Sequence, residues 1–133
     1  MTTNEKGRIT LAKVLARLSE KGKHVLVPFA NVGRYDLLID NRDGTFTRVE
    51  CKTARYKKGC IMFHTESRGG RGLKEAQDYS HDADVFGVWS SQTDKVYLIS
   101  VKDATLSSMM IRVEEPKSKG NYSNINWAKD YEF

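Results

Sequence analysis

Two carboxylates and one lysine of this 133-residue chain have the types and the spacing to act on one reacting group. Asp36 stands near the start of the run 35–40, whereas Glu50 and Lys52 stand two residues apart in the later run 45–52. Two carboxylates on one patch can hold a divalent cation beside a water, and such oxygen ligands suit Mg²⁺ or Mn²⁺ better than zinc. A water activated in this way can attack a phosphodiester, while the amine of Lys52 offsets the negative charge that develops.

A β-hairpin would bring these residues together. The run 35–40 is apolar with acidic residues near its ends, and the run 45–52 is rich in β-branched and aromatic residues that alternate with polar ones, so each predicts a strand. Residues 42–44 end in glycine and fit a three-residue loop whose last residue is left-handed. Such a loop pairs Asn41 with Thr45 and thereby sets the register of the hairpin.

In this register Asp36 lies opposite Glu50, and directly opposed residues have Cβ atoms roughly 4.5–5.5 Å apart. Lys52 shares the face of Glu50, since side chains two residues apart on a strand point the same way. Like charges that oppose each other destabilise a sheet, and a cation between them removes this cost. The alternative is an ordinary amphipathic hairpin whose three charged side chains form a solvated ion cluster. The spacing alone does not separate these two interpretations.

The surrounding sequence predicts a sheet with a helix packed on it. Apolar residues spaced at three and four predict a helix over residues 3–21, which Gly22 ends. Residues 24–29 predict a strand at a sheet edge or close to a strand end, because Pro28 cannot donate a backbone hydrogen bond. We expect further strands at 60–64, 84–89, 95–99 and 110–113, a basic turn at 55–59, a short helix or irregular segment at 73–79, and an aromatic tail at 125–133 that docks on the body or on a neighbouring subunit.

The composition suits a protein with one core and a polyanionic partner. The length and a hydrophobic content of 39% predict a single domain over residues 1–133. A net charge of +5, from 22 Lys and Arg against 17 Asp and Glu, favours DNA as a partner, although a merely soluble basic surface gives the same balance. Two cysteines make no disulfide framework, and we find neither a signal peptide nor a membrane-spanning run. We therefore expect a cytoplasmic, nucleoid-associated protein with no membrane partner.

Short segments along the rest of the chain accompany the motif Asp36, then Glu50-x-Lys52. These are Lys6-Gly7, Val25-Leu26-Val27-Pro28-Phe29, Gly33-Arg34-Tyr35-Asp36-Leu37, Lys52-Thr53-Ala54-Arg55, Tyr79, Asp82-Ala83-Asp84-Val85-Phe86, Val96-Tyr97-Leu98-Ile99 and Ile125-Asn126-Trp127-Ala128-Lys129-Asp130-Tyr131. Together they resemble the PD-(D/E)XK nuclease superfamily over nearly the whole chain. Within it the chain is similar to the small endonucleases associated with group I introns and, more distantly, to the archaeal-type Holliday junction resolvases.

The resemblance implies an α/β fold, the restriction-endonuclease-like core, in which a central mixed β-sheet with an antiparallel catalytic hairpin is flanked by helices. It implies that Asp36 and Glu50 are metal ligands and that the main-chain carbonyl of Cys51 is a third oxygen ligand. Lys52 would be the catalytic lysine, and Mg²⁺ the cofactor, with Mn²⁺ as a substitute.

One position departs from the family pattern. Relatives often carry a glutamate on the first helix, four residues after the glycine, where this chain has Leu11. Glu5 could substitute, but it is equally well placed to form a capping box with Thr2. The missing helix acid bears on a second metal site more than on the first.

The implied activity is Mg²⁺-dependent hydrolysis of DNA, by an endonuclease of the homing type or by one that selects a DNA structure, such as a Holliday junction resolvase. A catalytically silent DNA-binding module and a protein-interaction domain with a basic face are the alternatives. Cutting both strands requires two active sites, so we expect a homodimer or a higher symmetric homo-oligomer. The candidate phosphate contacts are basic residues near the hairpin or in the glycine-rich segment 67–72: Arg34, Arg55, Lys57, Lys58, Arg68 and Arg71.

Overall fold

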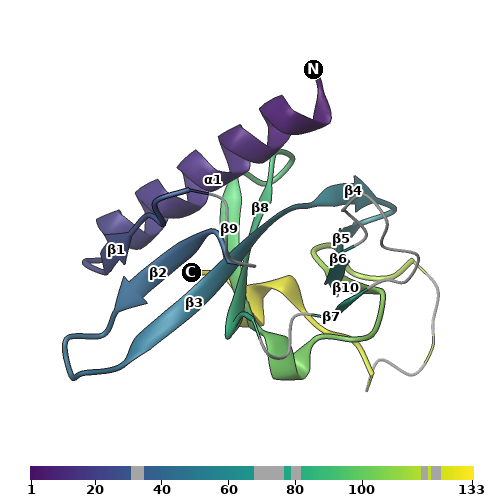
Figure 1. The fold of residues 1–133 in the computed structure, drawn as a ribbon. Coiled ribbons are helices and arrows are strands. Elements are labelled where there is room, and N and C mark those ends of the chain that lie inside the picture. Colours follow the sequence, from purple (N-terminus) through teal and green to yellow (C-terminus); the bar gives the residue numbers. More distant parts are fainter. Residues whose placement is uncertain (31–34, 68–76, 79–81, 118–119, 121–123) are drawn as a thin grey trace.

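A five-stranded mixed sheet forms the centre of the structure, a computed structural model that describes residues 1–30, 35–67, 77–78, 82–117, 120 and 124–133 (Figure 1). Its strand order is β1-β2-β3-β8-β9. The neighbours β3 and β8 run parallel, and the other three pairs are antiparallel. The strands are β1 His24–Leu26, β2 Leu37–Asp40, β3 Phe46–Thr53, β8 Val85–Ser90 and β9 Lys95–Ser100. The predicted central mixed sheet with an antiparallel hairpin, β2–β3, is therefore confirmed.

Helix α1 (Thr3–Glu20) covers one face of this sheet. It begins with a capping box, in which the Thr2 N–H donates to Glu5 Oε2 at 2.7 Å and the Glu5 N–H donates to Thr2 Oγ1 at 3.2 Å. These bonds satisfy backbone groups that a helix start otherwise leaves unpaired. The helix ends before Gly22, whose φ of 79° takes the left-handed conformation, as predicted. Its buried residues Val14 and Leu18 pack in one apolar cluster with residues of β2 and β3.

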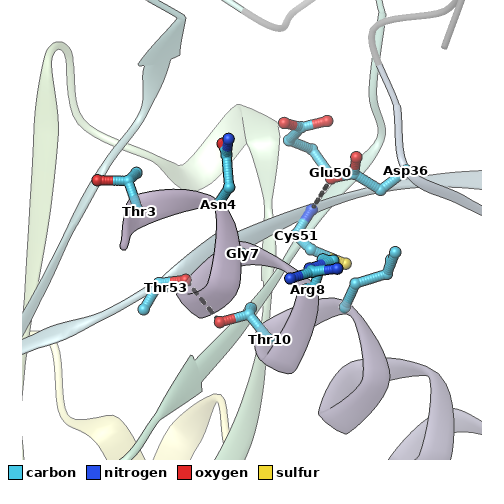
Figure 2. Close-up of a pocket in the computed structure, with 10 residues that line it drawn as sticks. Thr3, Asn4, Gly7, Arg8, Thr10, Asp36, Glu50, Cys51 and Thr53 are labelled. Carbon is cyan, nitrogen blue, oxygen red and sulfur yellow. Dashed lines mark hydrogen bonds between the residues drawn. The ribbon is translucent and has the colours of Figure 1, made fainter. Parts of the chain in front are cut away.

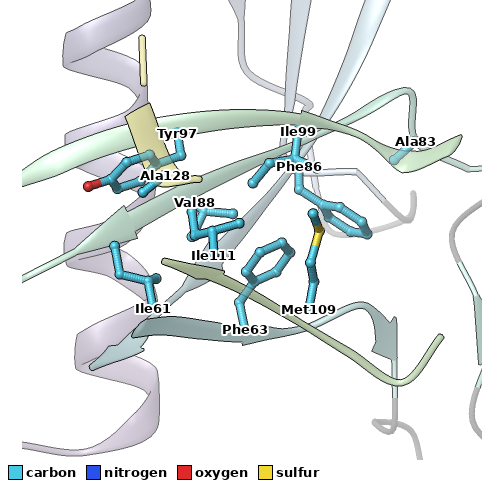
Figure 3. Close-up of a cluster of buried hydrophobic side chains, with 10 residues drawn as sticks. All are labelled: Ile61, Phe63, Ala83, Phe86, Val88, Tyr97, Ile99, Met109, Ile111 and Ala128. Atoms are coloured by element: carbon cyan, nitrogen blue, oxygen red, sulfur yellow. The ribbon is translucent and has the colours of Figure 1, made fainter. Parts of the chain in front are cut away.

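A smaller three-stranded sheet, in the order β10-β5-β4, covers the opposite face. Its strands are β4 Arg55–Lys57, β5 Cys60–His64 and β10 Ser108–Arg112. Figure 3 shows how its apolar side chains meet those of β8 and β9, for example Phe63 against Phe86, whose rings make an edge contact at 5.7 Å between centroids. The central sheet is thus buried on both faces, by a helix on one and by strands on the other.

This second sheet corrects two predictions. The central sheet was expected to be flanked by helices, but the described residues contain one α-helix, and strands take the other face. The predicted basic turn 55–59 is mostly strand: Arg55–Lys57 is β4, and the turn itself is Lys58 and Gly59. Both turn residues have positive φ, 51° and 78°, which is typical of a tight two-residue hairpin whose twist matches that of the flanking strands.

The remaining predictions agree with the structure to within a few residues. Strand β1 lies at the sheet edge and stops at Leu26, earlier than predicted, with Pro28 just beyond it. Strand β2 starts at Leu37, and β10 covers Ser108–Arg112 in place of 110–113. Of the segment 73–79, only Gln77–Asp78 is described; it forms β7, which pairs with β6 (Glu66–Ser67).

The C-terminal tail docks on the body of the protein, which was one of the two predicted outcomes. The Leu98 N–H donates to the Tyr131 carbonyl at 2.9 Å, and the Phe133 N–H donates to the Val96 carbonyl at 3.0 Å. Arg17 of α1 donates to the Phe133 carbonyl at 2.8 Å. Two short 3₁₀ helices, η1 Val101–Asp103 and η2 Ala128–Asp130, complete the described elements. None of the described helices has the length and apolarity that crossing a membrane requires.

Candidate active site

The hairpin β2–β3 has the predicted register. Leu37 pairs with Val49 and Asp40 with Phe46, and the Asn41 N–H donates to the Thr45 carbonyl at 3.1 Å. The ladder ends at Leu37 and Val49: the N–H of Asp36, the next residue, donates to that same Val49 carbonyl, so Asp36 does not continue the pairing toward Glu50 as predicted.

The loop that fixes this register is built from its own side chains. Gly44 is left-handed, with φ of 88°, as the three-residue loop requires. Asp40 accepts from the Arg42 N–H at 2.8 Å, and Asp43 accepts from the Thr45 N–H at 2.9 Å. These bonds also lower the pKa of the Asp43 carboxyl, because the Thr45 hydroxyl and N–H both donate to it. A short polar loop therefore sets which residues meet at the far end of the hairpin.

Asp36 is held in place by the backbone of β3. Its N–H donates to the Val49 carbonyl at 2.8 Å, and its Oδ2 accepts from the Cys51 N–H at 2.8 Å. A carboxylate that accepts a backbone N–H is fixed in orientation as well as in position. Asp36 therefore presents a preorganised oxygen at the point where β2 ends and β3 continues.

Asp36 and Glu50 line one hollow between the start of α1 and the end of β3 (Figure 2). We call it the N-terminal hollow; its volume is about 820 Å³. Figure 2 shows both carboxylates on the same side of β3, above the helix. The lining residues are Thr3, Asn4, Gly7, Arg8, Thr10, Leu11, Asp36, Glu50, Cys51 and Thr53.

Cys51 reports the electrostatics of this hollow. Burial raises the pKa of its thiol far above the ordinary value, and the neighbouring charges of Asp36 and Glu50 raise it further. The thiol packs against the apolar cluster under α1, as the alternation along β3 predicts, and it is not in a disulfide. The sulfur is thus a protonated, unreactive neighbour of the two carboxylates.

The main-chain carbonyl of Cys51 points to the open side of β3. In a strand the N–H and C=O of one residue point to the same edge, and the Cys51 N–H bonds Asp36 on the β2 side. Arg48 and Ala54 are each three positions from Cys51 along the chain, so their backbone groups point to the other edge of β3, toward β8. The Arg48 carbonyl accepts from the Asp84 N–H, and the Ala54 N–H donates to the Trp89 carbonyl. Since β2 begins only at Leu37, its ladder does not cover the Cys51 carbonyl.

These groups fit a hard divalent cation. The candidate donors are two carboxylates and one carbonyl oxygen, which is the ligand chemistry of Mg²⁺ and Mn²⁺. Within the described ranges no three side chains of His, Cys, Asp or Glu converge on one point. A cation here would therefore complete its shell with waters or with phosphate oxygens, as Mg²⁺ commonly does.

Lys52 lies on the face of β3 that Glu50 also occupies. It pairs in register with Val88, as Glu50 pairs with Phe86, so both side chains point away from α1. Lys52 is half-buried. The structure thus places the amine two residues beyond Glu50 along the same face, and Lys52 is not among the residues that line the hollow.

A cross-strand clamp fixes the start of the parallel pair. Asp84 Oδ2 accepts from the Arg48 N–H at 2.8 Å, and its Oδ1 lies 3.1 Å from Arg48 Nη2. The side-chain hydrogen bonds from Arg48 lower the pKa of the Asp84 carboxyl, which keeps it ionised. The clamp sits two residues before Glu50 and holds β3 against β8 there.

The candidate phosphate contacts divide into two groups. Arg55, Lys57 and Lys58 are exposed on β4 and its turn, directly after β3 leaves the hollow at Thr53. In Figure 1, β4 lies at the end of β3 that approaches the start of α1. The other three candidates, Arg34, Arg68 and Arg71, lie outside the described residues.

Glu5 does not line the N-terminal hollow. Its carboxylate is engaged in the capping box with Thr2, whose backbone and side-chain bonds lower its pKa. It lines a neighbouring surface with Arg8, Ile9 and Ala12. Of the two roles predicted for Glu5, the structure supports capping.

Sequence reasoning missed the helix residues that do line the hollow. Asn4, Arg8 and Leu11 recur at spacings of three and four, which puts them on one side of a helix. That spacing was visible in the sequence, but not which side of α1 faces β3. A buried Thr10, whose Oγ1 lies 2.5 Å from that of Thr53, fixes this orientation.

Comparison with known proteins agrees with this geometry. The structure is similar to that of a bacterial homing endonuclease, I-Ssp6803I, with a TM-score of 0.69 and 20% sequence identity over 98% of this chain and 86% of that chain. A search of curated proteins finds no significant match. The sequence profile described as PD-(D/E)XK endonuclease matches residues 1–133. The hairpin register, the mixed sheet and this match over the full length agree: the chain belongs to the PD-(D/E)XK endonuclease family.

Proposed function

We propose that this chain is a Mg²⁺-dependent endodeoxyribonuclease whose reaction takes place in the N-terminal hollow. The observation that carries the proposal is that Asp36 and Glu50 line one hollow, with Asp36 fixed by the Cys51 N–H. Two neighbouring carboxylates repel each other, and a cation bound between them removes this cost. PD-(D/E)XK nucleases generally use divalent metal ions, and the donor set here suits one.

Asp36, Glu50 and the Cys51 carbonyl would hold the cation, which when bound polarises the phosphate and lowers the pKa of a water. The protein contributes placement. The Cys51 N–H orients Asp36, and the clamp between Arg48 and Asp84 positions the strand that carries Glu50. Lys52, on the face of Glu50, stabilises the charge that grows on the phosphate or assists the attacking water.

DNA binding would extend from the hollow along β4. Arg55, Lys57 and Lys58 follow β3 within five residues of Thr53 and are exposed to solvent. Contacts of this kind supply affinity and register rather than sequence choice. Their removal should weaken binding to all duplexes and reduce its salt dependence by about one unit of slope per lost contact.

We favour a homing-type enzyme that cuts duplex DNA as a homodimer or a higher symmetric homo-oligomer. The similarity to a homing endonuclease over 98% of this chain supports the first part. Two strands of opposite polarity require two active sites, and a symmetric assembly supplies them. A Holliday junction resolvase would use the same hollow and the same symmetry on a four-way junction.

The test is a cleavage assay on supercoiled plasmid, linear duplex, a four-way junction, a flap and a single strand, with Mg²⁺, with Mn²⁺ and with EDTA. Nicks or breaks that need the metal are expected in wild type, and Glu50→Gln should abolish them while DNA binding persists. Symmetric cuts confined to the junction would make the enzyme a resolvase. Cleavage by Glu50→Gln at the wild-type rate would end the site assignment, and a monomer in sedimentation with and without DNA would end the assembly.

A further inference from the structure

The N-terminal hollow has one acidic wall and one basic wall. The acidic wall is Asp36 and Glu50, with the Glu50 side chain on the face of β3 away from α1, and the other wall is the first part of α1. Among the described residues that line the hollow, no acid comes from the helix; its charged contribution is Arg8. Asp36, Glu50 and Arg8 thus line one hollow, where β3 extends past the end of its ladder with β2.

Several features hold the helix wall in place. The Thr10 hydroxyl, on a side chain only 1% exposed, bonds the Thr53 hydroxyl at the far end of the hollow. Val14, four residues further along α1, is fully buried against the sheet. The capping box engages Glu5, so the carboxylate one turn before Arg8 is already bonded to Thr2. Arg8 thus projects from a backbone that is anchored on both sides of it.

Charge counting limits what the hollow can hold. A divalent cation between Asp36 and Glu50 brings that wall to neutrality, and the charge of Arg8 remains. A second divalent cation would have no acidic ligand on the helix side, where Leu11 stands, and would be repelled by Arg8. A phosphodiester gains negative charge as it is attacked, and a guanidinium can bond two of its oxygens at once.

We propose that Arg8 is a catalytic residue that contacts the reacting phosphate, so that the hollow works with one cation and one guanidinium per chain. The proposal rests on the proposed nuclease function for its substrate. In the protein without DNA, Arg8 repels the cation that Asp36 and Glu50 attract. Arg8 therefore weakens metal binding and strengthens cleavage.

The experiment uses Arg8→Gln, which keeps a polar side chain of similar length and removes the charge. Mn²⁺ binding to the full chain without DNA is measured by electron paramagnetic resonance. Wild type should bind one Mn²⁺ per chain, and Arg8→Gln should bind it roughly 3- to 10-fold more tightly, the effect of one positive charge on a divalent ion across a solvated space. Lys6→Gln, which removes the same charge from the same helix at a residue that does not line the hollow, should leave the affinity within about twofold.

Plasmid cleavage in Mn²⁺ is measured on the same proteins. Arg8→Gln should cut about 100-fold or more slowly, Arg8→Lys should recover part of the rate, and Lys6→Gln should cut as wild type does. With Ca²⁺ as a metal that supports binding, the salt slope of duplex affinity should fall by about 0.9 in Arg8→Gln. Thermal melting that matches wild type shows that the fold is intact.

The two proposals fail in different ways. If wild type cuts no DNA with either metal, the nuclease function fails, while the Mn²⁺ stoichiometry and affinity still test the charge arrangement. If wild type cuts and Arg8→Gln cuts at the same rate, Arg8 is not catalytic. Two Mn²⁺ per chain, or unchanged Mn²⁺ affinity in Arg8→Gln, overturns the single-cation arrangement.

Discussion

Replacing Asp36 by asparagine separates the two roles of this residue. Asp36 Oδ2 accepts the Cys51 N–H at 2.8 Å, and an amide oxygen in the same position can accept that bond. The charge, in contrast, disappears. Because Asp36 and Glu50 line the same hollow, losing one of these two like charges should stabilise the metal-free protein by roughly 0.2–1 kcal/mol. The substitution should therefore help the fold while it abolishes cleavage.

Metal binding should reverse the order of stability of wild type and Asp36→Asn. A ligand present at 100 times its dissociation constant stabilises the folded state by about 2.7 kcal/mol. Wild type should gain this amount from Mn²⁺, and Asp36→Asn, which retains one carboxylate, should gain almost none. Asp36→Ala has a different signature. It removes the acceptor of the Cys51 N–H as well as the charge, which should cost roughly 1–3 kcal/mol with or without metal.

Urea denaturation with and without saturating Mn²⁺ measures the stability of each variant and its gain from the metal. Plasmid cleavage measures the activity of the same proteins. Asp40→Asn is the matched control, because Asp40 lies on the same strand and accepts a backbone N–H, that of Arg42, at 2.8 Å, but does not line the hollow. It should keep both the metal response and the activity. An Asp36→Asn protein that Mn²⁺ stabilises as strongly as wild type would refute the view that this carboxylate holds the cation.

Two further predictions concern the framework of the site. Gly87→Ala should destabilise the fold by roughly 1–3 kcal/mol in urea denaturation, because its Cβ would lie 2.8 Å from Cγ1 of the stiff Val14 side chain. Gly7→Ala, where a Cβ meets nothing within 4 Å, should instead stabilise α1 by about 0.5–1 kcal/mol; equal effects of the two would contradict this packing. In the clamp between Arg48 and Asp84, the pKa of the Asp84 carboxyl is lower in the folded protein than in the unfolded chain. The clamp therefore stabilises the fold above the unfolded pKa of about 3.9, and this stabilisation is lost as the pH falls through the folded pKa. Asp84→Asn should accordingly lower the free energy of unfolding by less than about 1 kcal/mol at pH 7, since Arg48 and Asp84 are partly exposed. The difference from wild type should vanish in acid; a difference that persists at pH 2 would show that the substitution acts through packing.

Local turn chemistry made the hairpin β2–β3 predictable. Gly44 and the acidic loop residues allow few connections, and once the loop is fixed every cross-strand pair follows. The same holds for α1, where the capping box and Gly22 mark both ends. These signals lie within a few residues of what they determine, so one sequence suffices to interpret them.

The second sheet was harder to predict because its strands are short and far apart in the chain. Strand β10 pairs with β5 across more than forty residues, for example Met109 with Phe63. Short apolar runs fit a buried strand or a helix equally well by periodicity. The position of Arg8 at the hollow depends in the same way on a distant contact, that of Thr10 with Thr53, which fixes the side of α1 that faces the hollow. Such features are set by packing, and local preferences do not determine them.

The position of the site follows from unequal strand lengths. Strand β3 runs on to Thr53, whereas β2 starts only at Leu37, so the last residues of β3 keep β8 on one side and have no β2 ladder on the other. There a carboxylate side chain from Asp36 takes the place of the next backbone carbonyl in the ladder and bonds the Cys51 N–H. A hydrogen bond that would otherwise only extend a sheet thus orients a charged group at an open edge. Because side chains alternate along a strand, a slip of one residue in the hairpin would move Glu50 and Lys52 to the face under α1. The loop that fixes the register is consequently as much a requirement for the site as the charged residues themselves.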